Sequence, residues 1–522
     1  MAQAPVFEAG PQAPEKTAKK EGFPLSFDLP QANEKEKPMD QNSTLSESRR
    51  AAVGYLSRIF SEIVCAEGRG FLESEDLCMR EGHLLLAEAL SSALERYDDL
   101  LCSKLPDGLR IHDRRRRTLA TKLGDVKFSW RRCRDAAGST VIPLADALDI
   151  PWGARISPSA RAFLVEAGAE VSFAKSARLL GSAGGSSVSA ASVMGAVHKT
   201  GELCAREDEE AARSLYRDGV LPAAEGGSKE VCIEADGTWI RLQRAPEGAP
   251  KKVEIKALVS YAGKRERGSK VSRVSPVRHG CVGTPDRFWT EGIAAIGTRF
   301  DLSKIERVHF GSDGESFYKQ GHAWLPISAD TDTRLDPFHV SRAILSCFPA
   351  SGMPLARNVA GMAADGDAAS AAAVLDAAEE YGLANKRARK VADYLRRNEA
   401  MICGGGPSLG TMEAEQQHIY GCRMDSVPCG WSVVGADAMA RVRSRKYSGR
   451  ELPHPTRSQS ASPRRRARSS RREQAYLKTK IDTKVPVRVG RGSEAEHKAS
   501  LANCSAEVRY AAAIDSGMVG IG

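Results

Sequence analysis

The sequence predicts an α/β protein whose central sheet carries acidic residues at the ends of its strands. Residues 231–262 alternate between apolar and polar side chains and form two predicted strands joined by a Pro/Gly loop. Further strands are predicted at 307–311 and 324–327. DPFHVSRAIL then begins a helix, with Asp336 as N-cap and Pro337 at the first helical position. Strands followed by a helix, with carboxylates at the strand ends, are typical of an α/β sheet.

The composition sets the broad class of the protein. The chain has 522 residues, of which 42% are hydrophobic, and this is enough for more than one domain. The net charge of +10 modestly favours a polyanionic partner. The twelve cysteines include no C-x-x-C pair, which disfavours a zinc finger and is typical of reduced thiols. Because no stretch resembles a signal peptide or a membrane span, we expect a cytoplasmic protein without a membrane partner.

The N-terminal part divides into an arm and a first module. Residues 1–45 are rich in Pro, Glu, Lys, Gln and Asn and are predicted to be a disordered arm. Residues 46–150 are predicted to form a helical module followed by a basic strand region. Basic side chains interleaved with aromatics make a plausible phosphate-binding surface, although a solvated strand face explains the pattern equally well. The candidate DNA-binding residues here are Arg114, Arg115, Arg116, Arg117, Lys127, Arg131 and Arg132.

Residues 151–225 are predicted to form a helix-turn-helix-like DNA-binding region. A short helix (SFAKSARLL) precedes a Gly/Ser turn and a second helix (VSAASVMGAVHKTGEL), with Ser187 or Ser189 as its N-cap. In a DNA-binding motif of this kind the second helix would present Ser189, Ser192 and Lys199 to the major groove. Helical pairs with a glycine turn are also common in proteins that never touch DNA.

Residues 226–447 are predicted to form the main α/β domain, and 448–522 its tail. An Ala-rich stretch predicts a helical insertion at about 346–404. Two further helices are predicted after GGGP, in SLGTMEAEQQHIYGCRMD and GWSVVGADAMARVRSRKY. The Ser, Pro and Arg residues after Tyr447 predict a basic, disordered tail, which either holds DNA nonspecifically or is an unconstrained extension.

Three acidic residues in this domain are candidate metal ligands. Asp236 and Asp313 each end a predicted strand and precede a glycine, and Glu413 opens a predicted helix. Two Mg²⁺ ions activate a nucleophile and stabilise a leaving oxygen in phosphodiester cleavage, and carboxylates suffice to hold them. With 66 acidic residues in the chain, however, such a spacing is easily found by chance, and an Asp-Gly pair after a strand is often an ordinary turn.

Several motifs in order give the sequence a family resemblance. VCIEADGTWIRLQR, KIERVHFGSDGESFYKQG, LDPFHVSRAI and LGTMEAEQQHIYGCRMD resemble bacterial insertion-sequence transposases of the ISLre type. These belong to the DDE transposases, whose catalytic domain has an RNase H-like fold. The resemblance covers roughly residues 115–447, and it implies an RNase H-like mixed sheet with a helical insertion.

The resemblance also implies roles for particular residues. Asp236, Asp313 and Glu413 match the three catalytic acids that hold two Mg²⁺ ions, for which Mn²⁺ can substitute, and Glu415 is a close rival for the third position. Asp336 and His339 match a family DxxH block, and we expect second-shell or DNA-contacting roles for them. An interior helix position without a role in the site remains an alternative for His339. The family usually has a basic residue in place of Pro337.

The implied activity is DNA transposition. A transposase of this type would cut DNA at the terminal inverted repeats of its element and join the freed 3′-hydroxyl to target DNA. It would act as a homo-oligomer assembled on DNA, in the bacterial cytoplasm and associated with the nucleoid when bound. Two rival hypotheses remain: a catalytically inactive or repurposed DNA-binding protein derived from a transposase, and a metal-dependent nuclease on the same fold.

Overall fold

The computed structural model describes residues 41–243, 250–267, 270–314, 318, 320–402, 409–426 and 429–457. Most of the predicted N-terminal arm, and the predicted tail beyond residue 457, lie outside the described residues. The chain divides into two compact units, Met1–Cys78 and Met79–Gly522. No helix within the described ranges combines the length and the apolar character needed to cross a bilayer.

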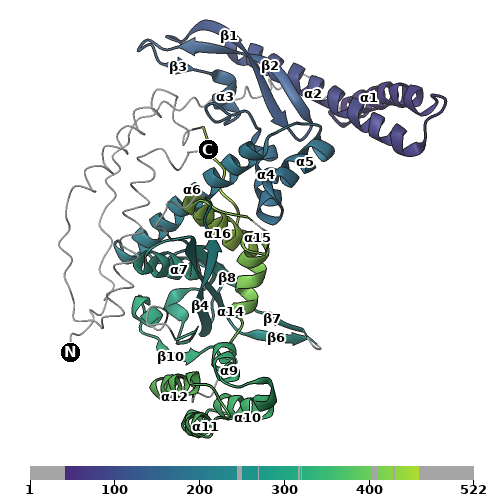
Figure 1. Cartoon of the computed structure of the whole chain (residues 1–522). Coiled ribbons are helices and arrows are strands. Elements are labelled where there is room, and N and C mark those ends of the chain that lie inside the picture. The colour runs from purple at the N-terminus through teal and green to yellow at the C-terminus, as the bar shows by residue number, and fades with distance from the viewer. Residues whose placement is uncertain are drawn as a thin grey trace. The chain divides into compact units, whose positions relative to one another are not determined.

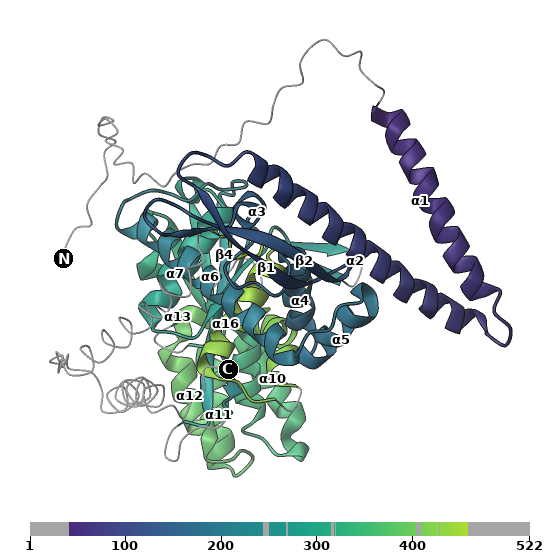
Figure 2. The same cartoon turned by 90° about the horizontal axis from the view of Figure 1, so that it is seen from above.

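The first unit contains helix α1 (Gln41–Val64) and the beginning of helix α2 (Phe71–Ser103). Figure 2 shows α1 as one uninterrupted helix. Both helices were predicted from the spacing of apolar residues and are confirmed. Val53 and Tyr55 of α1 are each about half exposed, at 54% and 52%.

The second unit begins with the rest of α2, and a three-stranded antiparallel sheet of order β1-β2-β3 follows. Its strands are β1 (Arg110–Thr121), β2 (Gly124–Arg134) and β3 (Thr140–Val141), and helix α3 (Pro143–Ala147) follows. Val126, Phe128 and Trp130 of β2 are buried, and this confirms the predicted alternation along the strand. The basic side chains between them lie on the opposite face of the sheet.

A group of three helices comes next in the chain. These are α4 (Pro158–Glu170), α5 (Phe173–Gly184) and α6 (Ala190–Tyr216). Ser189 is the N-cap of α6, and its hydroxyl accepts the backbone N–H of Ser192. Gly185 ends α5 in the left-handed region, at φ 67°. The predicted helix, glycine turn and second helix are therefore present, with the cap at one of the two predicted serines.

The main sheet has five strands in the order β10-β9-β4-β5-β8. Strand β5 pairs antiparallel with both β4 and β8, whereas β9 pairs in parallel with both β4 and β10. A separate hairpin of β6 and β7 lies between β5 and β8 in the chain. The bounds are β4 (Glu230–Arg241), β5 (Lys252–Tyr261), β6 (Lys264–Arg267), β7 (Lys270–Arg273), β8 (Val277–Cys281), β9 (Arg307–Ser312) and β10 (Asp330–Leu335).

Helices cover both faces of this sheet (Figure 1). On one face, Ile233 of β4 packs in a core with Trp289 of α7 (Pro285–Arg299). On the other, Ile240 of β4 packs with Tyr420 and with Met439 of α16. Two short helical segments follow α7 in the chain, namely η1 (Leu302–Lys304) and η2 (Gln320–Trp324). The helical elements at the C-terminal end of the domain are α14 (Met412–Glu415), the π-helical turn η4 (Gln416–Gly421), α15 (Cys422–Met424) and α16 (Val433–Tyr447).

A helical insertion separates β10 from α14. It packs around its own apolar core, which includes Val359, Leu375 and Leu395, and it confirms the insertion predicted at about 346–404. Small alanine side chains let its helices approach one another closely. The helices are α9 (Pro337–Leu345), η3 (Ala350–Gly352), α10 (Met353–Ala364), α11 (Ala368–Glu380), α12 (Arg387–Arg397) and α13 (Glu399–Ile402).

Two predictions about elements are wrong. The strand expected at 324–327 is absent, and the edge strand is instead β10, with the sequence DTDTRL. Its first residues are polar because β10 is the edge strand of the sheet and they are exposed, so that no apolar alternation marks it. The predicted tail also starts too early. Leu452 and Arg457 are buried, and the Arg457 guanidinium stacks 4.1 Å from the ring of Trp152.

Candidate active site

The sheet places two of the predicted acids beside each other. Strands β4 and β9 run in the same direction, with Glu234 opposite Gly311. Asp236 and Asp313 each lie two residues further along the chain, beyond the parallel pairing, and are therefore close together. Asp313 directly follows β9, as predicted, but the prediction that Asp236 ends a strand is wrong, because β4 continues to Arg241 in its pairing with β5. Parallel strands bring residues that are distant in sequence together at their carboxyl ends, where α/β proteins commonly place their sites.

A third carboxylate lies at the same edge. Leu335 at the end of β10 is opposite Ser312 of β9, and the N–H of Asp336 donates to the Ser312 carbonyl at 2.7 Å. Asp336 is therefore held next to Asp313, although the sequence predicted only a second-shell role for it. Three neighbouring strands each present one carboxylate at this edge, from Asp236, Asp313 and Asp336.

The environment of Asp236 disfavours its charged form. The residue is 7% exposed. Burial, and after it the like charge of Asp313, raises the pKa of Asp236 to about 7. The N–H of Gly237 donates to Asp236 Oδ1 at 2.7 Å and partly offsets this effect. In the described part of the chain, the one ion pair of Asp236 is with His339.

His339 lies between two of these carboxylates. Asp336 is the N-cap of α9, and its Oδ1 accepts the N–H of Phe338 at 2.8 Å. Its Oδ2 lies 3.4 Å from Nδ1 of His339, whose Nε2 lies 4.0 Å from Oδ2 of Asp236. The contact with Asp336, followed by the charge of Asp236, raises the pKa of His339. The imidazole therefore links Asp336 to Asp236.

The segment after Asp313 is fixed by a turn and by the insertion. Gly314 has φ +93°, and a Cβ atom there would lie 2.8 Å from a methyl group of Leu335. Both observations require glycine at this position. The hydroxyl of Tyr394 in α12 donates to the Asp313 carbonyl at 3.1 Å. The helical insertion thus contacts the site directly.

The two candidates for the third acid differ in their surroundings. Glu415 is buried and bound by two arginines: Arg278 Nε lies 2.6 Å from its Oε2, and Arg273 forms a second ion pair. Glu413 is exposed. Among the described residues, no hydrogen bond or ion pair joins Glu413 or Glu415 to Asp236. The structure therefore does not bring the predicted third acid into contact with the first.

A buried acid that the sequence did not single out anchors the start of α14. Glu234 Oε2 accepts the backbone N–H groups of Gly410 and Thr411, each at 2.7 Å. The hydroxyl of Tyr261 donates to Glu234 Oε1 at 2.5 Å. Glu234 precedes Asp236 by two residues and therefore lies on the same face of β4. The two-residue spacing of Glu234 and Asp236 in IEAD was the one sign in the sequence that Glu234 lies near the site. Through its hydrogen bonds, Glu234 connects the start of α14, which carries Glu413, to the strand that carries Asp236.

A divalent cation fits the residues at this edge. Asp236 and Asp313 repel each other when both are charged, and a cation between them would relieve the repulsion. The Oδ2 atom of Asp336 is buried and has no hydrogen-bond partner. Carboxylate oxygens are the ligands that Mg²⁺ and Mn²⁺ prefer.

Comparison with known proteins places the chain in a family. Residues 65–457 match UPF0236, which is described as an uncharacterised protein family. The chain belongs to the UPF0236 family. The matched range ends at Arg457, which is also the last residue that the structure describes.

Curated UPF0236 relatives come from Caldanaerobacter subterraneus subsp. tengcongensis. The protein TTE2489 is 23% identical over 390 residues, which are 70% of this chain and 76% of the relative. The protein TTE0402 is 24% identical over 360 residues, 65% of each chain. A third relative, 22% identical over 381 residues, covers 70% of this chain and 75% of its own length, and its name joins eleven loci. The chain thus spans about two thirds to three quarters of these relatives.

A second cluster in this UPF0236 chain could be mistaken for a metal site. Ligand atoms of His279, Cys281 and Glu291 lie within 4.8 Å of one another, and all three residues are buried. Glu291, however, is paired with Arg441 at 2.7 Å and with Arg287 at 2.8 Å. Burial raises the pKa of the Cys281 thiol to about 12, so it remains protonated. We therefore assign this cluster to a buried charge network.

Most of the predicted basic surface is neutralised within the UPF0236 fold. Among its arginines, Arg131 pairs with the fully buried Asp98 at 2.9 Å. Arg114 pairs with Glu95, Arg115 and Arg132 both pair with Asp113, and Arg117 donates to the Ala154 carbonyl and lies over Trp130. Arg116 and Lys127 are exposed, and no ion pair joins them to another described residue. Of the seven predicted residues, these two remain available for phosphate contacts.

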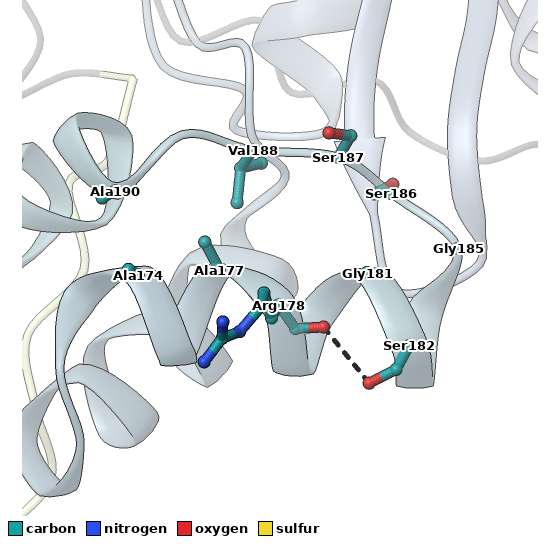
Figure 3. A pocket seen from close by; sticks show the side chains of 10 residues that line it. All are labelled: Ala174, Ala177, Arg178, Gly181, Ser182, Gly185, Ser186, Ser187, Val188 and Ala190. Carbon is teal, nitrogen blue, oxygen red and sulfur yellow. Dashed lines mark hydrogen bonds between the residues drawn. The ribbon is translucent and has the colours of Figure 1, made fainter.

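The predicted DNA-contacting residues of α6 also have partners within the chain. Ser189 and Ser192 share a hydrogen bond of 2.9 Å, and Lys199 pairs with Glu202 at 2.8 Å. A hollow of about 490 Å³ lies between α5 and the loop that leads to α6, lined by Arg178 among others (Figure 3). DNA recognition by this pair of helices stays a prediction.

Proposed function

We propose that this UPF0236 protein is a DDE-type DNA transposase of the ISLre type, with an RNase H-like catalytic domain. The observation that carries the proposal is that Asp236 and Asp313 lie side by side, each two residues beyond the last residue pair of the parallel strands β4 and β9. The strand order β10-β9-β4-β5-β8, with three antiparallel strands followed by two parallel ones, supports the RNase H-like fold. The helical insertion before α14 also supports the proposal, because the resemblance implies such an insertion between the second and third acids in the sequence.

The relatives add independent support. One relative bears the names of eleven loci of a single genome, and another bears the names of four. Many copies of one protein in one genome are what a mobile element would leave behind. This observation favours transposition over a cellular nuclease, for which a single copy would suffice.

In this proposal Asp236 and Asp313 hold two Mg²⁺ ions, for which Mn²⁺ can substitute. The bound ions would activate a nucleophile and stabilise the leaving oxygen of the phosphodiester. Glu413 completes the site in preference to Glu415, because Arg273 and Arg278 already neutralise Glu415. Glu413 is exposed in the first turn of α14, so it can turn toward the edge once DNA and metal are bound.

DNA binding would use surfaces away from the acids. Arg116 and Lys127 would contact phosphates, and the helices α5 and α6 would recognise the terminal inverted repeats. Because two element ends must be paired before they are joined to the target, the active complex would contain at least two copies of the chain. Phosphate contacts would make the binding steeply dependent on salt.

The test is a cleavage and strand-transfer assay with end-labelled DNA carrying the terminal repeats and with Mg²⁺ or Mn²⁺. We expect nicking at the repeat end and joining to a target plasmid. Asp236→Asn and Asp313→Asn should each abolish both steps. Asp330→Asn is the matched control, because this exposed acid begins β10 at the opposite end from Asp336. It should leave both steps intact.

Two further variants identify the third acid. We expect Glu413→Gln to remove cleavage, with the protein remaining folded. We expect Glu415→Gln to lower thermal stability, because it leaves Arg273 and Arg278 without their shared partner. Loss of cleavage in a folded Glu415→Gln protein and normal cleavage by Glu413→Gln would reverse this assignment.

Other outcomes of the same assay would support the rival hypotheses. Specific binding to the repeats without cutting would indicate an inactive or repurposed DNA-binding protein. Nicking without joining would indicate a metal-dependent nuclease. Cutting that survives both Asp236→Asn and Asp313→Asn would place the active site elsewhere.

A further inference from the structure

The strongest unexplained feature of the site is the histidine between its carboxylates. Asp336 Oδ2 and His339 Nδ1 are both buried, and neither makes a hydrogen bond. They face each other at 3.4 Å, just beyond hydrogen-bonding range. A small adjustment would let Nδ1 donate its proton to Oδ2. In its neutral form the ring would then carry no proton on Nε2, and that atom would be free to donate its lone pair to a cation, which takes the place of the second proton.

The Nε2 atom of His339 is directed at the predicted metal site. It lies 4.0 Å from Oδ2 of Asp236. Two atoms bound at about 2.1 Å and at a right angle to one ion are about 3 Å apart, so a shift of about 1 Å would bring both into one coordination sphere. The ring is partly exposed, at 26%, and has room for that shift.

We infer that His339 is a direct ligand of one divalent cation through Nε2, and that Asp336 is the positioning residue that orients its ring. A carboxylate bound to the far nitrogen of a metal-ligating histidine is a common arrangement, since it fixes both the tautomer and the ring orientation. This inference rests on the proposed metal site. It replaces the second-shell role that the sequence suggested for His339.

Asp336 suits this role because its two oxygens have separate tasks. Oδ1 caps α9 by accepting the N–H of Phe338, and only Oδ2 is directed at the imidazole. The N–H of Asp336 is held by the Ser312 carbonyl, one residue before Asp313. The orientation of the histidine is thus coupled to the strand that carries the second acid.

A nitrogen ligand would change the choice of metal. Mg²⁺ prefers all-oxygen sites, whereas imidazole suits transition metals better. The position that contains His339 should therefore favour Mn²⁺ over Mg²⁺ more than a site built from carboxylates alone. The second position, which lacks the histidine, should show no such preference.

Electron spin-echo spectroscopy of the full chain with bound Mn²⁺ tests this without any DNA or activity. We expect ¹⁴N modulation from a coordinated imidazole, which converts to the ¹⁵N pattern when the histidines are ¹⁵N-labelled. His339→Ala should remove the modulation and weaken Mn²⁺ binding about tenfold or more. His418→Ala, which changes an exposed histidine outside the site, should change neither.

Asp336→Asn separates the positioning role from helix capping. Asparagine can still cap α9 through its oxygen, but it presents an N–H group to His339. The imidazole would then carry its proton on Nε2, which cannot bind metal in that form. We expect unchanged thermal stability together with loss of the ¹⁴N modulation.

The outcomes separate this inference from the function on which it rests. Mn²⁺ binding that depends on Asp236 but shows no ¹⁴N modulation would overturn the role of His339 and leave the transposase proposal intact. Modulation that persists in His339→Ala would do the same. Failure of the wild type to bind Mn²⁺ at all would overturn both.

Discussion

At the scale of single residues, the buried carboxylate of Glu291 depends on its cationic neighbours. Burial alone would raise its pKa, but His279, whose Nε2 lies 3.4 Å from the carboxylate, and the charges of Arg441 and Arg287 lower the pKa to about 2 from 4.5. A carboxyl group whose pKa is lowered by folding stabilises the folded protein at pH values above its pKa in the unfolded chain. That contribution is lost as the pH falls through the folded value.

This sign gives a prediction for acid unfolding. Between pH 4.5 and about 2, the free energy of unfolding should fall more steeply for the wild type than for Glu291→Gln. The difference should total roughly 3 kcal/mol across the window. Denaturant titrations at a series of pH values would measure it. Parallel pH profiles for the two proteins would show that Glu291 is not held in its charged form by this network.

Some residues of the candidate site could be predicted from the sequence, and others could not. Motif context was enough to single out Asp236 and Asp313, and the parallel pairing of β4 with β9 then explains why they meet. The position of Asp336 at the same edge could not be predicted, because it depends on strand β10. The pairing of Glu415 with Arg273 and Arg278 was equally hidden, since these arginines lie more than 130 positions earlier in the chain.

At the scale of elements, strands β1 and β2 contain many basic residues, but only some of their charges are free to contact DNA phosphates. Arg131 pairs with buried Asp98, whereas Arg116 and Lys127 are exposed. We expect the double substitution Arg116→Ala and Lys127→Ala to reduce the salt slope of DNA binding by about 2, at unchanged stability. Salt titrations of binding to labelled duplex would measure the slope. An unchanged slope would remove this surface from the DNA interface.

Arg131→Ala should behave in the opposite way. It leaves the buried Asp98 carboxylate without its ion-pair partner, and removing one member of a buried pair typically costs about 3–5 kcal/mol. Because Arg131 is partly exposed, at 23%, we expect the lower end of that range. Thermal unfolding would show the loss. A stability equal to that of the wild type would mean that Asp98 is neutral in the folded protein.

The contact between helices α6 and α16 requires a glycine. A Cβ atom on Gly201 would lie 2.4 Å from the Cα atom of Ala438. Gly201→Ala should therefore destabilise the fold by about 1–3 kcal/mol. Gly195 lies on the same helix with nothing within 4 Å, so Gly195→Ala should stabilise by about 0.5–1 kcal/mol. Equal effects of the two substitutions on unfolding would contradict the close approach of these helices.

Elements with strong apolar periodicity were predicted well, and weakly patterned ones were not. The helices of the insertion and α16 follow from long periodic stretches. Strand β10 has no such pattern, because it is the edge strand of the sheet and only its last two residues are buried. The apolar stretch at 324–327 was mistaken for that strand, although Leu325 and Ile327 pack beside the core of α7 without pairing.

At the scale of the folded second unit, residues up to Arg457 belong to the structure. Helix α16 lies against α6 and β8, where Arg441 and Arg445 both pair with buried Asp208. We expect a chain ending at Arg457 to match the thermal stability of the full chain, since it keeps every described contact. A chain ending at Gly430 should not fold cooperatively, which circular dichroism and limited proteolysis would show. Cooperative unfolding of the shorter chain would contradict this role of α16.

The dependence on α16 bears on how copies of such a gene decay. Every acid proposed for the site is encoded before α16 begins. A late frameshift or stop codon would therefore leave the codons of all the proposed acids intact while removing the helix that packs against the sheet. Genome surveys that count such genes by their acidic motifs would then overestimate the number of copies that encode a folded protein. An intact reading frame through the arginines of α16 would be the better criterion.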